Sequence, residues 1–176
     1  MKESWCRSGR THHYHGLRPN WVVTFRKLRS RIGESLGDLP LSIDHVGSTA
    51  IQGAAAKPII DIDVALKSLT DVAKAISALE EAGYKHLGDL GITGREAFES
   101  PANLPAHHLY VVVLGSREHA RHVRFRDYLR RHPETTTEYS VLKKSLAQKF
   151  RNDREAYTEA KTAFIEAILR QAGGTE

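Results

Sequence analysis

The chain has 176 residues, of which 40% are hydrophobic and 27% charged, and this composition predicts one globular domain that buries about 70% of its unfolded surface. It excludes a transmembrane helix, because no apolar run approaches the roughly 18 residues that a membrane span needs. The formal net charge of +5 allows anionic partners, but many soluble domains are mildly basic, so charge alone is weak evidence for nucleic-acid binding.

Residues 1–16 show neither a helical nor a strand period, and we expect them to form a mobile N-terminal arm. They contain Cys6, the only cysteine, which excludes an intramolecular disulfide and fits a reducing compartment such as the cytoplasm. The first fifteen residues also lack the apolar segment of a secretory leader. A disordered tail explains the histidines at positions 12, 13 and 15 better than a metal site does.

We expect a single domain over residues 17–172. Its first helix is predicted between Pro19 and Gly37, because apolar residues recur at helical spacing, proline suits a first turn, and glycine ends a helix. The predicted inward stripe consists of Val22, Phe25, Leu28, Ile32 and Leu36.

Alternating apolar residues over 41–46 predict a first strand, which Gly47, Ser48 and Thr49 follow directly. A Gly-Ser turn after a strand brings backbone N–H groups and hydroxyls close to an anion, since Gly47 has no side chain in the way. His45, at the end of this strand, either approaches that anion or is a hydrogen-bonded core histidine, and the core interpretation is favoured.

Residues 59–66 predict a second strand, because β-branched residues dominate the segment and Pro58 stands at its entry. The period of two points Asp61 and Asp63 to one face, and the intervening isoleucine and valine residues then face a core. Two neighbouring carboxylates repel each other, and a divalent cation neutralises them most simply; oxygen ligands suit Mg²⁺ or Mn²⁺. A solvated acidic face on an edge strand is the open alternative.

The middle of the chain predicts a further helix and two more strands. Ser68 or Thr70 is expected to cap the helix, which runs to about Glu81. The strands are expected over 95–100 and 108–114. Strands that alternate with helices, followed by helices only, predict an α+β fold: a mixed β-sheet with helices packed on it and a helical C-terminal part.

Three helices complete the predicted domain. Ser116 is expected to cap the first, which reaches about Arg131; Pro133 begins the second, and Asp153 caps the third. The predicted inward stripe of the second is Tyr139, Leu142, Leu146 and Phe150. Most basic residues of these helices are expected to form a solvated face. The basic residues in question are Arg117, Arg121, Arg124, Arg126, Arg130, Arg131, Lys143, Lys144 and Lys161.

A Gly-Ser pair, a spacer of about a dozen residues and an Asp-x-Asp on a strand resemble the signature of the DNA polymerase β-like nucleotidyltransferase superfamily. More closely, the chain resembles the GrpB family, which carries the fold of that superfamily. The resemblance covers roughly residues 17 to 172 and is carried by segments 45–50, 56–62, 107–111, 125–130 and 157–165.

This resemblance implies a metal-dependent transfer of a nucleoside monophosphate from a nucleoside triphosphate to a small-molecule or protein acceptor. Asp61 and Asp63 would hold the Mg²⁺ or Mn²⁺ ions that stabilise the entering and leaving oxygens. The phosphates would bind at Gly47, Ser48, Thr49, Lys57, Arg126 and Lys161.

Three of these residues have an equally simple structural interpretation. Lys57 fits an ordinary surface lysine as well as a phosphate ligand. Arg126 can instead form a salt bridge with a nearby acid, and Lys161, four residues after Tyr157, can instead stack on that ring.

Active nucleotidyltransferases commonly have a third carboxylate on a neighbouring strand, where it can take the proton of the attacking hydroxyl. The corresponding strand here, over 107–114, contains no Asp or Glu. His108 and Tyr110 share one face of it, so His108 is the candidate replacement as base or ligand. Glu96 or Glu99, on the preceding strand, is the alternative.

Without that carboxylate, a non-catalytic nucleotide-binding or regulatory module is the main alternative to an enzyme. The pI of about 9.4 suggests an RNA-binding accessory protein as a weaker one, but a short chain without a second nucleic-acid module favours other acceptors. No membrane partner is expected. GrpB proteins also occur joined to dephospho-coenzyme A kinase domains, which implies a nucleotide context, although this chain has no P-loop motif.

Overall fold

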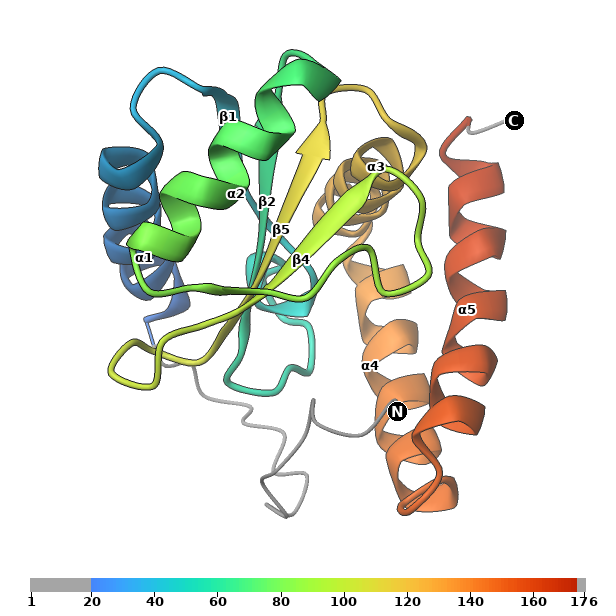
Figure 1. The fold of residues 1–176 in the computed structure, drawn as a ribbon. Coiled ribbons are helices and arrows are strands. Elements are labelled where there is room, and N and C mark those ends of the chain that lie inside the picture. Colours follow the sequence, from blue (N-terminus) through green and yellow to red (C-terminus); the bar gives the residue numbers. More distant parts are fainter. Residues whose placement is uncertain (1–19, 174–176) are drawn as a thin grey trace.

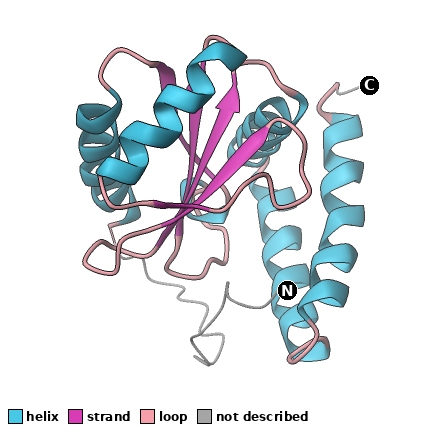
Figure 2. Ribbon diagram, in the orientation of Figure 1, coloured by secondary structure: helices cyan, strands magenta, loops and turns pink. Residues whose placement is uncertain are grey.

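A five-stranded mixed sheet with helices on both faces forms the part of the chain that the computed structural model describes, residues 20–173 (Figure 1). The predicted arm 1–16, its histidines and Pro19 lie outside this range. The strands are β1 (Pro40–Val46), β2 (Ile60–Leu66), β3 (Lys85–His86), β4 (Arg95–Glu99) and β5 (His107–Val113). The helices are α1 (Trp21–Leu36), α2 (Val72–Glu81), α3 (Arg117–Arg131), α4 (Pro133–Lys149) and α5 (Arg154–Gln171), with short 3₁₀ turns η1 (Ser48–Ala50) and η2 (Leu69–Asp71). Figure 2 shows the strands as one sheet with helices packed around it. Along the chain, strands are interspersed with helices up to β5 and only helices follow, as predicted.

The strand order is β1-β2-β5-β4-β3, with β2 and β5 parallel and the other described pairs antiparallel. A parallel pair needs a long connection, which α2, β3 and β4 supply. In this register Asp61 lies opposite His108 of β5, and Asp63 lies opposite both Asp44 of β1 and Tyr110 of β5. β2 is therefore an interior strand and not an edge strand, and both of its aspartates have residues of a neighbouring strand on either side.

One face of the sheet packs against α1 and α2 around an apolar core. The β2 residues predicted to face a core, Ile60, Ile62 and Val64, lie in this one together with Leu66. The α1 stripe needs one correction, because Trp21 is buried whereas Val22 is 52% exposed. Trp21 lies seven residues, or about two helical turns, before Leu28 and so points to the same side of the helix.

The other face of the sheet is covered by α3, and α4 and α5 stand beside it as a helical pair (Figure 1). A second apolar cluster holds these helices together: Phe125, Leu129, Tyr139, Ile168 and Leu169. The predicted boundaries are confirmed, since the side chains of Ser116 and Asp153 cap α3 and α5 and Pro133 begins α4. Among residues 20–173, no helix has the length and apolarity needed to cross a membrane.

The middle of the chain differs from the prediction in two details. Ser68 accepts a hydrogen bond from the Thr70 N–H and caps η2, so α2 begins only at Val72. The strand β3 was not predicted, because two residues are too short to show an alternation. It forms where its backbone pairs with Glu99 and Phe98 of β4.

Candidate functional site

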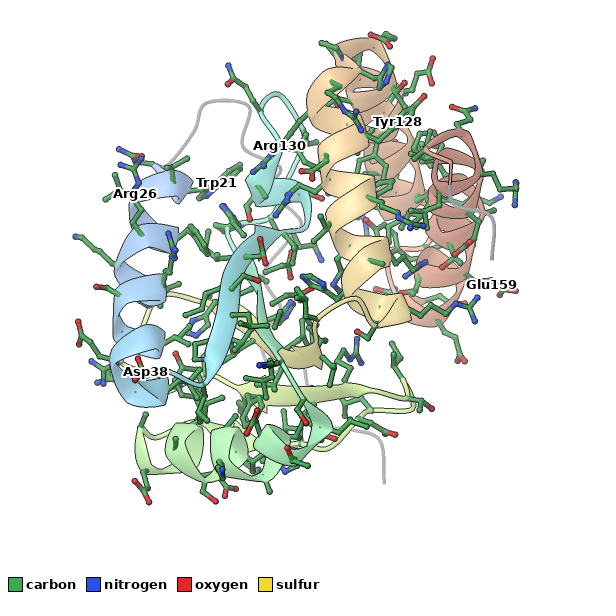
Figure 3. The ribbon with its side chains drawn as sticks, turned by 90° about the horizontal axis from the view of Figure 1, so that it is seen from above. Trp21, Arg26, Asp38, Tyr128, Arg130 and Glu159 are labelled. Carbon is green, nitrogen blue, oxygen red and sulfur yellow. The ribbon has the colours of Figure 1, made fainter. Side chains whose placement is uncertain are left out.

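The face of the sheet beneath α3 is polar at its centre. Figure 3 shows α3 lying along β1, with side chains of both elements filling the space between them. The sheet contributes Asp44, Asp61, Asp63, His108 and Tyr110, and α3 contributes Glu118, His119, His122 and Arg126. Asp61 and Asp63 thus share one face of β2, as their two-residue spacing predicts.

Gly47 brings the loop after β1 into contact with the carboxylate of Asp61. Its φ of 67° lies in the left-handed region, which favours glycine. A Cβ at this position would overlap the Asp61 carboxylate, so any other residue would force the loop and the strand apart. The two halves of the sequence motif, Gly-Ser and Asp-x-Asp, therefore meet at this point.

Asp61 forms a dyad with His108. The Nδ1 of His108 lies 2.9 Å from Oδ1 of Asp61, and the two side chains are 32% and 30% exposed. His108 occupies the β5 position directly opposite Asp61, on the strand where the resemblance to nucleotidyltransferases leads one to expect a third carboxylate. Imidazole therefore takes that place beside a carboxylate that ligands can reach.

Asp63 is enclosed and paired with a histidine that the sequence analysis did not identify. Its side chain is fully buried, and its Oδ2 lies 2.8 Å from Nδ1 of His122, whose Nε2 lies 3.1 Å from Glu118. Burial by itself would lower the pKa of His122, but hydrogen bonds and charges from Asp63 and Glu118 outweigh it and raise the pKa to about 9. His122 is therefore a cation at neutral pH and neutralises Asp63. The sequence feature that could have identified His122 is its spacing of four from Glu118, which places both residues on one side of α3.

A metal ion at this site would depend on Asp61 and Asp63. Residues 20–173 contain no group of three or more His, Cys, Asp or Glu side chains that could hold a metal ion. Yet Oδ1 of Asp63 is buried without a hydrogen-bond partner among these residues, a state that is costly for a carboxylate. This oxygen and the partly exposed Asp61 are the carboxylate groups that a cation at this site would have to use.

Lys143 is the second residue that the sequence analysis did not identify, because it was assigned to a solvated face. It is only 6% exposed, and its Nζ donates 2.6 Å hydrogen bonds to Oγ of Ser48 and to the carbonyl of Ala55. A second bond, from the Ala55 N–H to Oγ of Ser140, also fixes this loop to α4. The buried stripe of α4 passes through Lys143 rather than the predicted Leu142.

Lys57 and Lys161 place further positive charge near Lys143. Burial, with the charges of Lys161 and Lys57, lowers the pKa of Lys143 to about 7, although Asp61 acts in the opposite direction. Lys57 and Lys161 are thus close enough to act on the charge of Lys143, which itself contacts the Ser48 hydroxyl. Lys161 also lies 5.8 Å from the ring centroid of Tyr157, the stacking that the sequence left open.

His45 and Thr49 belong to the interior. Nε2 of His45 lies 3.0 Å from Oγ1 of Thr49, and that hydroxyl also donates to the carbonyl of Ile59. The His45 ring stacks on Phe25 at 4.6 Å, and burial lowers the pKa of His45 to about 4, so the ring is neutral at pH 7. The core interpretation of His45 is confirmed, and the hydroxyl of Thr49 serves the same contact.

Arg126 is engaged in the salt bridge that the sequence offered as its alternative role. It donates to Oδ1 of Asp44 at 3.4 Å, to the carbonyl of His45 at 3.1 Å, and through Nε to Asp127 at 2.7 Å. It therefore ties α3 to the edge strand β1.

Glu96 and Glu99, the alternatives to His108 as catalytic base, lie away from this site. Glu96 pairs with His86 at 2.7 Å and Glu99 with Lys85 at 3.9 Å, both on the β3–β4 side of the sheet.

Residues 15–171 match the family model described as GrpB protein. The chain belongs to the GrpB family. It is 41% identical over 157 residues to the Glutamate-rich protein GrpB of Alkalihalophilus pseudofirmus, with 86% of this chain and 90% of that protein covered. The crystal structure of conserved protein GrpB from Enterococcus faecalis superposes with a TM-score of 0.80 at 32% identity, covering 91% of this chain and 96% of that one.

A more distant relative carries the name of an enzyme. Dephospho-CoA kinase of Mycolicibacterium paratuberculosis is 25% identical over 179 residues, which covers 88% of this chain but 44% of that protein. The GrpB-family chain described here thus corresponds to less than half of that enzyme.

Proposed function

We propose that this GrpB-family protein binds a nucleoside triphosphate and transfers its nucleoside monophosphate to a small-molecule or protein acceptor, as nucleotidyltransferases of the DNA polymerase β-like superfamily do. The observation that carries the proposal is the contact of the Gly47–Ser48 bend with Asp61, while Lys143 reaches Ser48 from α4. A hydroxyl and an ammonium group suited to phosphate therefore stand beside a partly exposed carboxylate.

The phosphate end of the nucleotide would bind at Ser48 and Lys143. Phosphate oxygens would accept hydrogen bonds from the hydroxyl and from the ammonium group. The bound anion would also offset the charges of Lys57 and Lys161, which lower the pKa of Lys143. Lys57, Lys143 and Lys161 are thus the positive side of the site.

Asp61 and Asp63 would hold Mg²⁺ or Mn²⁺, which would stabilise the charge that develops on the entering and leaving oxygens. Protein sites for Mg²⁺ commonly use one or two carboxylates and take the remaining ligands from substrate phosphates and water. Two carboxylates therefore suffice when the nucleotide is bound. The buried Oδ1 of Asp63 is an oxygen that such an ion would satisfy.

His108 would take the proton of the acceptor. The acceptor oxygen attacks the α-phosphorus, the bond to pyrophosphate breaks, and the acceptor proton passes to the imidazole. Asp61 holds Nδ1 of His108 at 2.9 Å, which orients the ring and leaves proton transfer to Nε2. The carboxylate thereby has two roles, as cation ligand and as the group that positions the base.

A second function, nucleotide binding without turnover, has its own supporting observations. The β5 position opposite Asp61 holds His108 instead of a third carboxylate, and Asp63 is enclosed by His122. Both features leave fewer oxygens for cations than a complete catalytic site would offer. A regulatory GrpB module of this kind would bind triphosphate and release no pyrophosphate.

The similarity to a dephospho-CoA kinase supports a nucleotide context for either function, because kinases bind nucleoside triphosphates. The relative is a longer protein, of which this chain covers 44%. This chain has no P-loop motif of its own. In such a longer protein, the GrpB-like part would therefore not carry out the phosphoryl transfer itself.

The first experiment measures binding of ATP, GTP, CTP and UTP with Mg²⁺ by calorimetry. Lys143→Met replaces the apolar stem of the side chain and removes the ammonium group, so we expect at least about a tenfold loss of affinity. Lys144→Met, at the exposed neighbouring position, is the matched control and is expected to bind normally. Absence of binding by all four nucleotides to the unmodified protein would refute the proposal.

The second experiment measures pyrophosphate release and transfer of label from an α-labelled triphosphate to candidate acceptors. Asp61→Asn and His108→Ala are expected to abolish release, whereas Asp38→Asn, at an exposed position, is expected to leave it unchanged. Tight binding without pyrophosphate release across a broad acceptor set would replace the enzyme with the regulatory module.

A further inference from the structure

The outer side of α3 carries a regular line of arginines. The helix contains six arginines and two carboxylates in fifteen residues. Arg117, Arg124 and Arg131 are exposed and recur every seven residues, so they lie along one side of the helix, about 10 Å apart. We name these three residues the α3 strip.

Neither acid of α3 forms an ion pair with the α3 strip, because both serve other partners. Glu118 contacts His122 at 3.1 Å and turns toward the sheet, and Asp127 pairs with Arg126 at 2.7 Å. Arg131 donates one hydrogen bond, through Nε, to the carbonyl of Asp127, whereas a guanidinium group has five N–H donors. The strip therefore presents concentrated positive charge to solvent.

We propose that the α3 strip binds the backbone phosphates of single-stranded nucleic acid. Arginine binds phosphate in a planar, bidentate manner, which suits it to this ligand better than lysine. A flexible single strand can adjust its phosphates to a straight line of charges, whereas a duplex presents them at fixed positions. This inference goes beyond the proposed nucleotide chemistry and does not depend on it.

The surroundings of the strip favour nucleic acid over a membrane surface. Membrane-binding helices combine basic residues with large apolar side chains that insert among the lipids. Within α3, no large apolar side chain is exposed; Phe125 and Leu129 are buried. Net charge alone was weak evidence, but this arrangement adds a defined, purely polar contact line.

The strip also leads toward the candidate site. Arg130, one residue before the end of α3, donates a 3.0 Å hydrogen bond to the carbonyl of Ala50 in η1, and Figure 3 shows its side chain beside that loop. η1 begins with Ser48, so a nucleic-acid strand that follows α3 would pass close to the residue proposed to bind phosphate.

The test is fluorescence anisotropy with labelled oligouridine and oligothymidine of about twenty nucleotides, titrated from about 50 to 200 mM salt. The triple variant R117Q/R124Q/R131Q is expected to lose at least tenfold in affinity. Its salt slope, d log K/d log[salt], is expected to fall by about two, since each phosphate contact on a single strand contributes about 0.7. Comparison of the affinities for oligouridine and oligothymidine shows whether the strip prefers RNA or DNA.

The matched control is R26Q/R29Q/R31Q, which removes the same charge from exposed positions of α1, on the other side of the sheet. It is expected to keep affinity within about twofold. Equal losses in both variants would overturn the proposal, because they would reflect diffuse charge. No binding of either oligonucleotide, or binding of phosphatidylserine vesicles alone, would overturn it as well. The nucleotide-binding calorimetry described above is unaffected by any of these outcomes.

Discussion

The Nζ of Lys143 lies 2.6 Å from the Oγ of Ser48, although 95 residues separate them in the chain. The contact fixes the loop after β1 to α4 and buries the amino group of Lys143 beside the Gly47–Ser48 turn. A buried charge is costly unless polar partners surround it, and two oxygen acceptors do so here. This contact joins the sheet half of the molecule to the C-terminal helices.

Binding of a triphosphate is expected to be coupled to proton uptake by Lys143. In the unbound protein the pKa of Lys143 is lowered to about 7, so the amine is mostly neutral at pH 8.5. A bound phosphate favours the charged form and raises this pKa, so affinity is full below about pH 7 and weakens as the pH rises above it. Calorimetry at pH 8.5 in buffers of different ionisation enthalpy measures the uptake. Lys143→Met should abolish it and Lys144→Met should not; equal uptake in both variants would contradict the assignment.

Gly47→Ala is expected to destabilise the fold more than Gly53→Ala. Both glycines have positive φ, which costs an L-residue roughly 1–2 kcal/mol. Only at Gly47 does the added Cβ overlap a neighbour, the Asp61 carboxylate, whereas nothing lies within 4 Å of a Cβ at Gly53. Urea unfolding should therefore give about 1–2 kcal/mol for Gly53→Ala and a clearly larger loss for Gly47→Ala. Equal losses of unfolding free energy in the two variants would show that the loop at Gly47 moves away from Asp61 at little cost.

His122→Ala is expected to lower the free energy of unfolding by about 3–5 kcal/mol, because it leaves the fully buried Asp63 without its counter-charge. The double variant with Asp63→Ala should lose less than the sum of the two single variants, since removing both partners leaves no uncompensated charge. Urea unfolding of all four proteins gives the coupling energy directly. Strict additivity would mean that the two side chains do not interact.

Arg126→Gln is expected to weaken the fold and to spare nucleotide affinity. The guanidinium group bonds Asp44, Asp127 and the carbonyl of His45, so its loss should cost about 1–3 kcal/mol in urea unfolding. Arg124→Gln, an exposed position on the same helix, should stay within about 0.5 kcal/mol of the unmodified protein. A tenfold loss of ATP affinity at unchanged stability would instead make Arg126 a phosphate ligand.

Much of the local structure follows from the sequence because it depends on neighbours in the chain. Ser116 and Asp153 cap helices through backbone groups three residues away, and Pro133 begins α4 by its fixed φ. The two-residue period of β2 places Asp61 and Asp63 on one face. Each of these predictions uses information within a few residues.

Which charges neutralise one another depends on contacts between residues that are far apart in the chain. Asp63 and His122 are 59 residues apart, and Ser48 and Lys143 are 95 apart. Lys143 follows Tyr139 by four residues on the buried side of α4, but lysine is so seldom buried that its position predicted a solvated residue. Helical and strand periods specify the direction of a side chain from its own element, whereas its partner depends on how the elements pack. The family and its two motifs are therefore readable along the chain, and the histidine and lysine that complete the site appear only when α3 and α4 fold against the sheet.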